Sequence, residues 1–530
     1  MDVTTLPFSE IPQFSSRDKA YVEQDPRLRP FYRHPPTLTA FADALAAKQR
    51  ADIDRPLLLR VLRDQYAQLD REEAVMANIE RLADEKTFTV VTAHQPCLFT
   101  GPLYFIYKIA SAIRLTEVLQ ATYPDYHFVP VFVTGGEDHD FAEINHAHLF
   151  GQTIEWENDE AGPVGRMKTT TLDEPLARLR EILGDSDNGR QAFDLVATAY
   201  GNHRQYGMAT IDLVHQLFKR WGLVALSMDQ PELKKRFLPI MEEELFSSPS
   251  QPLIEATTRQ LEEAGFSGQA YAREINLFYL SDQSRERIVR ENDRYQVLNT
   301  DFSFSAEELR QELQTHPERF SPNVILRPLY QEAILPNLAY VGGGGELAYW
   351  LERKSQFAHF GIDFPILIRR NSVLWIDSSA AKRMEKLGLS ERDILRKTDD
   401  LIREHVHAHA SEELNLQAEK EALNELFDRV AGKAGKVDQT LVGAVEAERV
   451  KQIKSLEQLE GRLVRAEKQK HENAINQIRS IRDKLFPENG LQERYDNFLA
   501  YYLRYGPEFL TVLVQHLNPL EQGLIVVWDR

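Results

Sequence analysis

Phe128-Val129-Pro130-Val131-Phe132-Val133 decides the fold, because this run is nearly continuous in apolar residues, as is typical of a strand covered on both faces. Upstream, Phe88-Thr89-Val90-Val91 predicts a second strand. Between them, residues 103–120 carry isoleucines and leucines at helical spacing. Strand, helix and strand in this order form a parallel βαβ unit. Residues 88–133 therefore predict the beginning of an open parallel sheet.

The same alternation recurs downstream. A helix over 211–221 is predicted to lead into a strand at 223–228. Further elements are predicted in the order strand 323–326, strand 338–341, helix 346–357 and strand 364–368. Repeated alternation of this kind predicts an α/β fold of the Rossmann-like class, with a mostly parallel sheet.

Two long polar segments interrupt this core, at about 155–202 and 250–315, and we expect them to be inserted helical or mixed subdomains. The core with these insertions is predicted to span residues 1–380. Residues 488–530 are aromatic and end in Gly523-Leu524-Ile525-Val526-Val527-Trp528, which predicts a strand that returns to the core sheet.

Between these parts, residues 381–487 lose most glycine and proline and become rich in Glu, Lys, Arg, Leu and Gln. Leu456, Leu459, Leu463 and Ala466 follow a 3-4-3 spacing, which predicts an α-helical coiled coil. The alternative is a plain helical bundle packed on the core. Ala431-Gly432-Lys433-Ala434-Gly435 is the predicted turn between the two arms.

Charge and cysteine content narrow the function classes. The 63 basic and 81 acidic residues give a formal net charge of -18, which repels nucleic acid and anionic membranes at long range but allows a local pocket for a small anion. The single cysteine, Cys97, excludes an internal disulfide. The N-terminus lacks the pattern of a signal peptide, and no run approaches the ~20 apolar residues of a membrane span. We expect a cytoplasmic protein.

Ligands of open parallel sheets bind outside the carboxyl ends of the strands, so residues that follow strands are the candidate site. The first segment is Thr92-Ala93-His94-Gln95-Pro96-Cys97, followed by Thr100, the expected N-cap of a helix whose free amides suit a phosphate or carboxylate. His94 and Gln95 are candidates for chemistry, although a histidine bonded to a neighbouring loop fits the same pattern. Cys97 is either a nucleophile or a buried inert thiol.

The second segment is Gly136-Glu137-Asp138-His139-Asp140, where ionisable side chains crowd the loop after a strand. Such crowding pushes pKa values apart and favours acid/base chemistry. With His146 the segment could hold a divalent ion, but the gap between its histidines is not a standard zinc spacing, so no metal is predicted. The alternative is an N-cap and a salt-bridge cluster at the start of a helix from Phe141.

The third segment, Val341 to Glu346, follows a strand and contains Gly342 and Gly343, which let a ligand approach the backbone closely. It matches neither the dinucleotide nor the P-loop fingerprint. Arg327, at a predicted strand end, could bind a carboxylate or phosphate, or form a surface ion pair. His405, His407 and His409 are interpreted as a solvated helix face.

Together these segments resemble a known family. The resemblance lies in Phe99 to Tyr104, Gly136 to His146, Arg327-Pro328 with Gln331-Glu332, and Tyr340 to Trp350. In these residues the chain resembles the bacillithiol synthase family, the cysteine ligases of bacillithiol biosynthesis. This resemblance implies a Rossmann-like, nucleotidyltransferase-like core with connecting insertions and a C-terminal coiled coil that forms a homodimer. Many relatives carry Gly-Gln-Gln-x-Gly where this chain has Ala93-His94-Gln95-Pro96-Cys97.

The resemblance further implies the last step of bacillithiol assembly, which joins L-cysteine to glucosaminyl malate. Because amide formation from a free carboxylate is uphill in water, the carboxylate must be activated, and a nucleotide (ATP or ADP) is the expected cofactor. We hypothesise that His94 stabilises charge at the activated carboxyl and that Asp138 or His139 accepts the proton of the amine. The remaining expected contacts are Gln95, Thr100, Arg327 and Gln331 to substrate, Asn145 and Glu346 to sugar hydroxyls, and Gly342 and Gly343 to the nucleotide.

Two other functions stay open on the sequence. One is a nucleotidyltransferase or acyl-activating enzyme that acts on another small acid. The other is a non-enzymatic coiled-coil dimer whose core is a degenerate ligand-binding scaffold.

Overall fold

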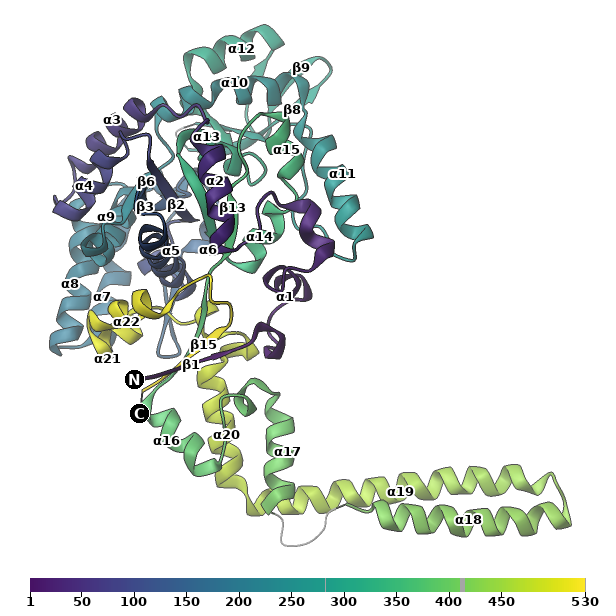
Figure 1. The fold of residues 1–530 in the computed structure, drawn as a ribbon. Helices are drawn as coiled ribbons and strands as arrows, with labels where there is room; N and C mark the ends of the chain where they lie inside the picture. The colour runs from purple at the N-terminus through teal and green to yellow at the C-terminus, as the bar shows by residue number, and fades with distance from the viewer. Residues whose placement is uncertain (282, 410–414, 530) are drawn as a thin grey trace. The chain divides into compact units, whose positions relative to one another are not determined.

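The computed structural model describes residues 1–281, 283–409 and 415–529. Its central element is a five-stranded sheet in the order β13-β12-β2-β3-β6, in which every neighbouring pair is parallel (Figure 1). The strands are β2 (Thr87–His94), β3 (His127–Thr134), β6 (Val224–Ser227), β12 (Asn337–Gly342) and β13 (Ile366–Arg369). This sheet confirms the predicted Rossmann-like class.

Burial explains why the apolar runs form the centre of this sheet. All positions of β2 are buried except its last residue, His94, and β3 is buried from its second residue to its end. Helix α5 (Tyr104–Thr122) connects the two strands and packs on both. Because β2 has β3 on one side and β12 on the other, chain order reverses between β2 and β12. That reversal is the place where ligands bind in open α/β sheets.

One predicted strand is wrong. Residues 323–326 form a turn that leads into helix α13 (Arg327–Ile334). The side-chain oxygen of Asn323 accepts hydrogen bonds from the backbone of Ile325 and Leu326, so local turn chemistry outweighs the apolar run. Arg327 therefore begins a helix instead of ending a strand. The helix predicted over 346–357 is present as two pieces, α14 (Gly344–Trp350) and α15 (Lys354–His359).

The two insertions differ in type. The first contains helices α7 (Asp173–Leu183) and α8 (Asp187–Asn202). The second begins with α11 (Ser250–Glu263) and builds an antiparallel sheet in the order β10-β9-β8-β7-β11. Its strands are β7 (Leu277–Leu280), β8 (Arg285–Glu291), β9 (Arg294–Val297), β10 (Ser303–Phe304) and β11 (Phe320–Pro322).

The predicted C-terminal strand exists as β15 (Leu524–Trp528), but it does not join the core sheet. It lies in a separate sheet of order β1-β15-β14, with β1 (Asp2–Leu6) and β14 (Ser372–Ile376). The β6 edge of the core sheet is covered by helix α3 (Arg55–Tyr66). There the Gln65 side chain bonds the backbone of Ala225 and Ser227, which leaves little of that edge for another strand.

The chain divides into two compact units, one of residues 4–374 and 492–525 and the other of residues 1–3, 375–491 and 526–530. The second unit is mostly helical. Its helices are α16 (Ser378–Leu387), α17 (Thr398–His409), α18 (Gln417–Val437), α19 (Leu441–Lys470) and α20 (Glu472–Leu485). On α17, His407 and His409 are exposed, as predicted, while His405 is half-buried with its ring stacked on His409.

Helices α18 and α19 form an antiparallel hairpin, with ion pairs between Lys420 and Glu460 and between Arg449 and Asp428. The turn predicted at 431–435 is wrong, because these residues continue α18. Ala and Lys are strong helix formers, and the two glycines, Gly432 and Gly435, cost the helix only about 1 kcal/mol each. The chain turns instead at 438–440, where the Asp438 carboxylate accepts hydrogen bonds from Thr440. Among the described helices, none has the length and apolar character needed to cross a bilayer.

Candidate ligand cleft at the strand ends

A cavity of about 700 Å³, called the cleft below, lies at the carboxyl ends of β2, β3 and β12. Its core-side lining comes from the three segments that follow these strands, and its opposite wall from the second insertion. The lining residues used below are His94, Gln95, Tyr104, Glu137, Asp138, His139, Phe278, Arg285, Arg327, Gly343, Gly345, Glu346 and Arg370. The cleft therefore occupies the position where chain order reverses.

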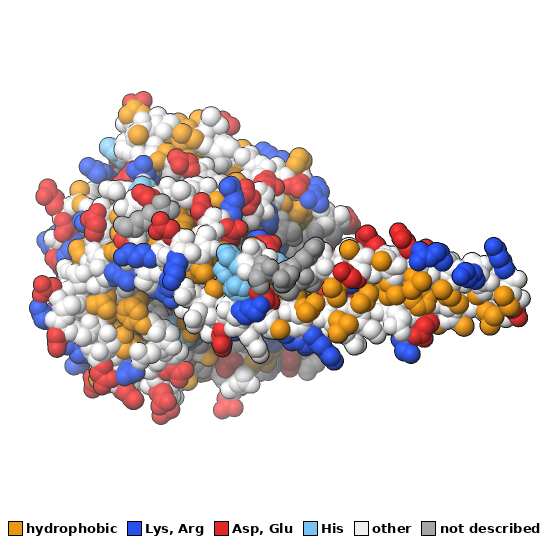
Figure 2. Space-filling view, turned by 90° about the horizontal axis from the view of Figure 1, so that it is seen from below, with side chains coloured by type: hydrophobic (Ala, Val, Ile, Leu, Met, Phe, Trp, Pro, Cys, Tyr) orange, Lys and Arg blue, Asp and Glu red, His pale blue; other side chains and the backbone are white. Residues whose placement is uncertain are grey.

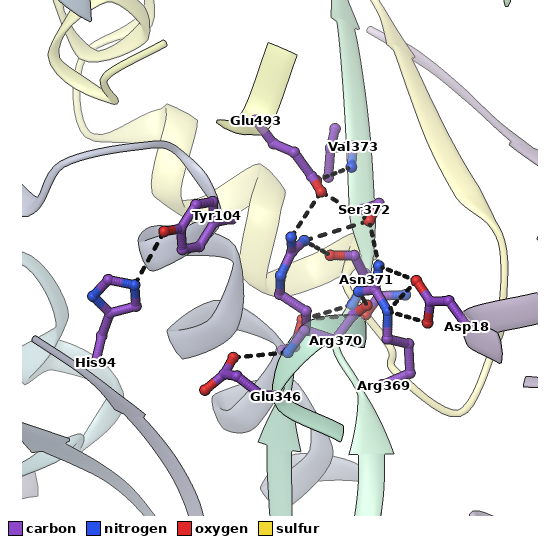
Figure 3. A network of polar contacts seen from close by, with 12 residues as sticks. Asp18, His94, Tyr104, Glu346, Arg369, Arg370, Asn371, Ser372, Val373 and Glu493 are labelled. Atoms are coloured by element: carbon purple, nitrogen blue, oxygen red, sulfur yellow. Dashed lines mark hydrogen bonds and ion pairs between the residues drawn. The ribbon is translucent and has the colours of Figure 1, made fainter. Parts of the chain in front are cut away.

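His94 at the end of β2 is held by two hydrogen bonds, of which Figure 3 draws the one to Tyr104. Its Nδ1 lies 3.1 Å from the backbone oxygen of Gln95, and its Nε2 lies 3.2 Å from the hydroxyl of Tyr104. A backbone carbonyl only accepts, so Nδ1 carries the proton and Nε2 accepts from the Tyr104 hydroxyl. Burial lowers the pKa of His94 to about 4, and the nearby charge of Lys108 adds to the shift. His94 is therefore a neutral imidazole at physiological pH.

The neutral state of His94 can be tested by titration. We expect its imidazole to stay uncharged down to about pH 5 and to titrate with a pKa of about 4, whereas an exposed histidine titrates near pH ~6.5. Heteronuclear NMR of the full chain labelled in histidine measures this midpoint. The His94 signal is identified by its loss in His94→Gln. A midpoint at about 6 or above would contradict the neutral state and the hydrogen-bond assignment of His94.

Cys97 lies behind His94, with its Sγ 3.6 Å from the Nδ1 atom. Burial raises the pKa of the Cys97 thiol to about 12, and the negative charge of Glu143 acts in the same direction. A thiol this weakly acidic is a poor nucleophile. Of the two roles considered for Cys97, the structure favours the buried, inert one.

Thr100 is not the N-cap of α5, which begins at Tyr104 with Leu103 as its N-cap. Thr100 is fully buried, in a short turn where Phe99 and Thr100 both have positive φ. Asn497 shapes this turn, since its side-chain amide donates to the backbone oxygens of Phe99 (2.8 Å) and Gly101 (2.7 Å). The prediction failed because a residue far away in sequence fixes the turn.

Gln95 connects the first segment to the second. Its side-chain amide donates to Asp138 (2.6 Å) and to Glu143 (3.0 Å). Burial alone would raise the pKa of Asp138, but the bond from Gln95 and the charge of Arg285 lower it below its ordinary value. Asp138 is thus a carboxylate whose neighbours favour the ionised form.

Asp140 has the N-cap role that the alternative interpretation of this loop predicted. It is the N-cap of α6 (Phe141–Ile144), and its side chain accepts from the backbone of Glu143. Among the described residues, no group of three or more His, Cys, Asp and Glu side chains is arranged to bind a metal ion.

Arg285, from β8 of the second insertion, was missed by the sequence analysis. It is almost fully buried, donates to Ser321 and to the Pro322 backbone, and lies over the Phe278 ring. Its Nη1 is 3.1 Å from Nδ1 of His139. Because a guanidinium group only donates, the Nδ1 of His139 must be the acceptor, and the ring proton is on Nε2.

Glu346 lies in the third segment, on the core side of the cleft. Its carboxylate caps α14 by accepting from the backbone of Gly343 (2.9 Å), and it also binds the Tyr340 hydroxyl (2.6 Å) and Lys108 (2.8 Å). Burial acts to raise the pKa of Glu346, but Lys108 and the Gly343 amide lower it to about 2. Lys108, buried on α5, is a second residue that the sequence analysis did not select.

Arg370 also lines the cleft, and the Glu493 carboxylate neutralises its positive charge (Figure 3). The two side chains are 2.7 Å apart and almost fully buried, and Glu493 also accepts from Ser372 and the Val373 backbone. The position of Arg370 at the cleft wall is thus fixed by the C-terminal segment.

The predicted site residues divide into two groups. His94, Gln95, Asp138, His139, Arg327, Gly343 and Glu346 are brought together in the cleft lining. Thr100, Asn145, Gln331 and Gly342 are not among its lining residues. Gln331 is fully buried and bonds Arg327 and Glu332, so it supports the wall from behind. Asn145 donates to the Trp156 backbone.

Fold and site define the chain as a Rossmann-like α/β protein with an arginine-rich ligand cleft at the point where strand order reverses. Comparison with known families gives a more specific assignment. The family description "Bacillithiol biosynthesis BshC, N-terminal Rossmann-like domain" matches residues 1–371, and "Bacillithiol biosynthesis BshC, C-terminal coiled-coil domain" matches residues 373–528. The chain belongs to the BshC family of bacillithiol biosynthesis.

Full-length relatives agree with this assignment. A protein of Flavobacterium johnsoniae named "Putative cysteine ligase BshC" is 42% identical over 516 residues, which are 97% of each chain. Relatives of the same name from Christiangramia forsetii and Cytophaga hutchinsonii are 39% and 38% identical. They align over 99% of both chains in the first case, and over 96% of this chain and 95% of the relative in the second.

Proposed function

We propose that this chain is a ligase that adds L-cysteine to glucosaminyl malate through an activated carboxylate, in the last step of bacillithiol biosynthesis. Family membership supports the class of reaction. The observation that supports the substrates is the charge of the cleft. Six arginines line it, Arg273, Arg285, Arg287, Arg327, Arg370 and Arg494, against the acidic Glu137, Asp138 and Glu346. Guanidinium groups are the preferred partners of carboxylates and phosphates, which both substrates and an activating nucleotide carry.

A nucleotide, ATP or ADP, is the activating cofactor in this proposal. The cleft residues fit it, because Gly343 and Gly345 lie in the lining and a Cβ placed at Gly345 would meet no described atom within 4 Å beyond its chain neighbours and the backbone of its own helix. A ligand can therefore approach the backbone there. Gly343 and Gly345 would hold the nucleotide together with Arg370. When bound, the nucleotide supplies the activating group for the carboxyl of cysteine.

The proton acceptor in this mechanism is Asp138 rather than His139. Arg285 occupies the only ring nitrogen of His139 that could take a proton, so His139 faces substrate as a donor through Nε2. As the new C–N bond forms, the activating group leaves the carboxyl carbon with the electrons of its C–O bond. The amine nitrogen becomes positively charged in this step, and even a weakly basic carboxylate can then accept its proton.

The Nδ1 proton of His94 is donated to Gln95 and the Tyr104 hydroxyl proton to His94, so neither group is a free donor for the activated carboxyl. In this proposal the guanidinium groups of Arg327 and Arg370 stabilise the charge that develops there, and His94 orients the Tyr104 hydroxyl beside them.

The proposed activity can be tested in cells by mass spectrometry of small thiols. A strain that lacks this chain is expected to lose bacillithiol and to accumulate glucosaminyl malate. Restoring the gene should reverse both changes. If the enzyme activates another small acid instead, bacillithiol will persist in the deletion strain and glucosaminyl malate will not accumulate.

We also propose a homodimer through the hairpin α18–α19. Apolar side chains gather along this hairpin in Figure 2. Those with large exposed fractions are Leu426, Val430, Val437, Leu441, Val450, Leu459 and Leu463. A second copy of the hairpin would bury this stripe, as in a coiled coil.

The dimer is tested by placing charge in the stripe. Leu459→Lys combined with Leu463→Lys is expected to weaken self-association about 100-fold or more, because each lysine would lie in an apolar interface. Sedimentation of the full chain measures the change. Glu457→Lys with Gly461→Lys is the matched control, since both positions lie on the opposite face of α19. A dimer that survives the leucine replacements would rule out the hairpin as the interface.

A further inference from the structure

The second insertion turns one face of its antiparallel sheet toward the cleft. Arg285 and Arg287 are separated by one residue on β8, so their side chains lie on the same face. Phe278 on β7 pairs with Arg287 across the two strands and belongs to this face too. All three residues line the cleft, and so does Arg273, which precedes β7. Three guanidinium groups therefore gather on one side of the cleft, called the arginine wall below.

Two of these arginines have no acceptor of their own. Arg273 and Arg287 are exposed and form no ion pair or side-chain hydrogen bond with the described residues. Carboxylates next to them in sequence are engaged elsewhere, since Glu274 binds Arg290 and Glu286 accepts a hydrogen bond from an asparagine (3.0 Å). The donors of both guanidinium groups are thus available to a ligand.

The acidic residues of the cleft leave this charge in place. Glu137 and Glu346 are each paired with a buried lysine. Asp138 is the third carboxylate of the lining, and it lies 3.8 Å from Arg285. Guanidinium groups gathered on one wall repel one another, and an anion that binds there removes the repulsion. The arginine wall therefore favours a ligand with more than one negative group.

The position of the proton acceptor indicates which substrate reaches this wall. In the proposed function Asp138 accepts the proton of the attacking amine, so the amine lies near Arg285 as well. The amine belongs to glucosaminyl malate, whose malyl group carries two free carboxylates. The carboxyl of cysteine loses its charge on activation, whereas the malyl carboxylates keep theirs throughout the reaction. A lasting dianion is thus the group that this wall meets.

We infer that the arginine wall is the subsite for the malyl group of glucosaminyl malate, an inference that rests on the proposed function. Arg273 and Arg287 bind the malyl carboxylates, because the planar guanidinium group matches a carboxylate through two parallel hydrogen bonds. Arg327 and Arg370 on the core side are then left for the activated carboxyl and the nucleotide. The second insertion is the part of the chain that selects the amine substrate.

Isothermal titration of the full chain without nucleotide tests this subsite. The two probes are glucosaminyl malate and its dimethyl ester, in which both malyl carboxylates are uncharged. Wild type is expected to bind glucosaminyl malate about 100-fold or more tightly than the ester. Arg273→Ala combined with Arg287→Ala is expected to reduce this preference to about 10-fold or less, because only Arg285 then remains on the wall.

Arg259→Ala combined with Arg294→Ala is the matched control. Both arginines are exposed, belong to the second insertion on α11 and β9, and are not among the residues that line the cleft. The control removes the same amount of charge and is expected to keep the wild-type preference. Thermal unfolding of each variant checks that the replacements at these exposed positions leave the fold intact.

Four results would overturn the subsite: wild type that binds neither probe, wild type that binds both equally, an unchanged preference after loss of Arg273 and Arg287, or an equal loss in the control. The proposed reaction is judged separately, by product formation. Product from a chain whose preference does not depend on the two arginines would refute the subsite alone. The expected preference without any product would refute the reaction alone.

Discussion

Asp138→Asn is expected to lower kcat for amide formation by about 100- to 10,000-fold, which is the usual effect of removing a general base. The asparagine side chain has the same shape and can still bond Gln95, but it cannot accept the proton of the attacking amine. The rate is measured by mass spectrometry of product formed from L-cysteine and glucosaminyl malate in the presence of nucleotide.

Asp140→Asn is the matched control for this variant. Asp140 lies two residues further along the same loop, but it caps α6 and is not in the cleft lining. Its kcat is expected to stay within a few-fold of wild type, since asparagine is also a good N-cap residue. An Asp138→Asn enzyme as active as the Asp140→Asn enzyme would exclude Asp138 as the proton acceptor.

Glu493→Ala is expected to lower the free energy of unfolding by about 3 to 5 kcal/mol. Glu493 and Arg370 form an ion pair at 2.7 Å with side chains only 1% and 2% exposed. Removing the carboxylate leaves the Arg370 charge buried without its partner, and Ser372 and the Val373 amide lose an acceptor. Urea unfolding of the full chain measures the loss.

Two further variants separate this effect from a general loss of charge. Glu508→Ala removes an exposed glutamate from the first turn of α22 (Glu508–His516) and is expected to cost less than about 1 kcal/mol. Glu493→Gln keeps acceptor capacity without the charge, so its stability is expected to lie between wild type and Glu493→Ala. If Glu493→Ala unfolds no more easily than Glu508→Ala, the buried pair does not stabilise this wall.

Local patterns were sufficient to predict the core of the fold. The apolar runs at 88–91 and 128–133 lie in β2 and β3 because a central parallel strand is buried on both faces. The residues at or just after the ends of these strands include His94 and Asp138, which do meet in one cleft. The topological rule for parallel sheets needs only the strand ends, so this part of the site could be predicted from sequence.

Other features depend on contacts between distant residues, which no local pattern contains. Asn497 shapes the turn at Thr100, and Glu493 fixes Arg370. Arg285 reaches His139 from an insertion whose sequence reads as an ordinary polar segment. In these cases tertiary contacts override or supplement the local signal. The strand predicted at 323–326 failed for a local reason instead, because the Asn323 side chain forms a turn that leads into α13.

The central claim is that this cleft joins L-cysteine to glucosaminyl malate through a nucleotide-activated carboxylate. Its most direct test is mass spectrometry of a reaction that contains the purified full chain, both substrates and either ATP or ADP. We expect an amide product with the mass of bacillithiol, formed only when nucleotide is present. Absence of that product with both nucleotides, from a chain that is folded, would contradict it.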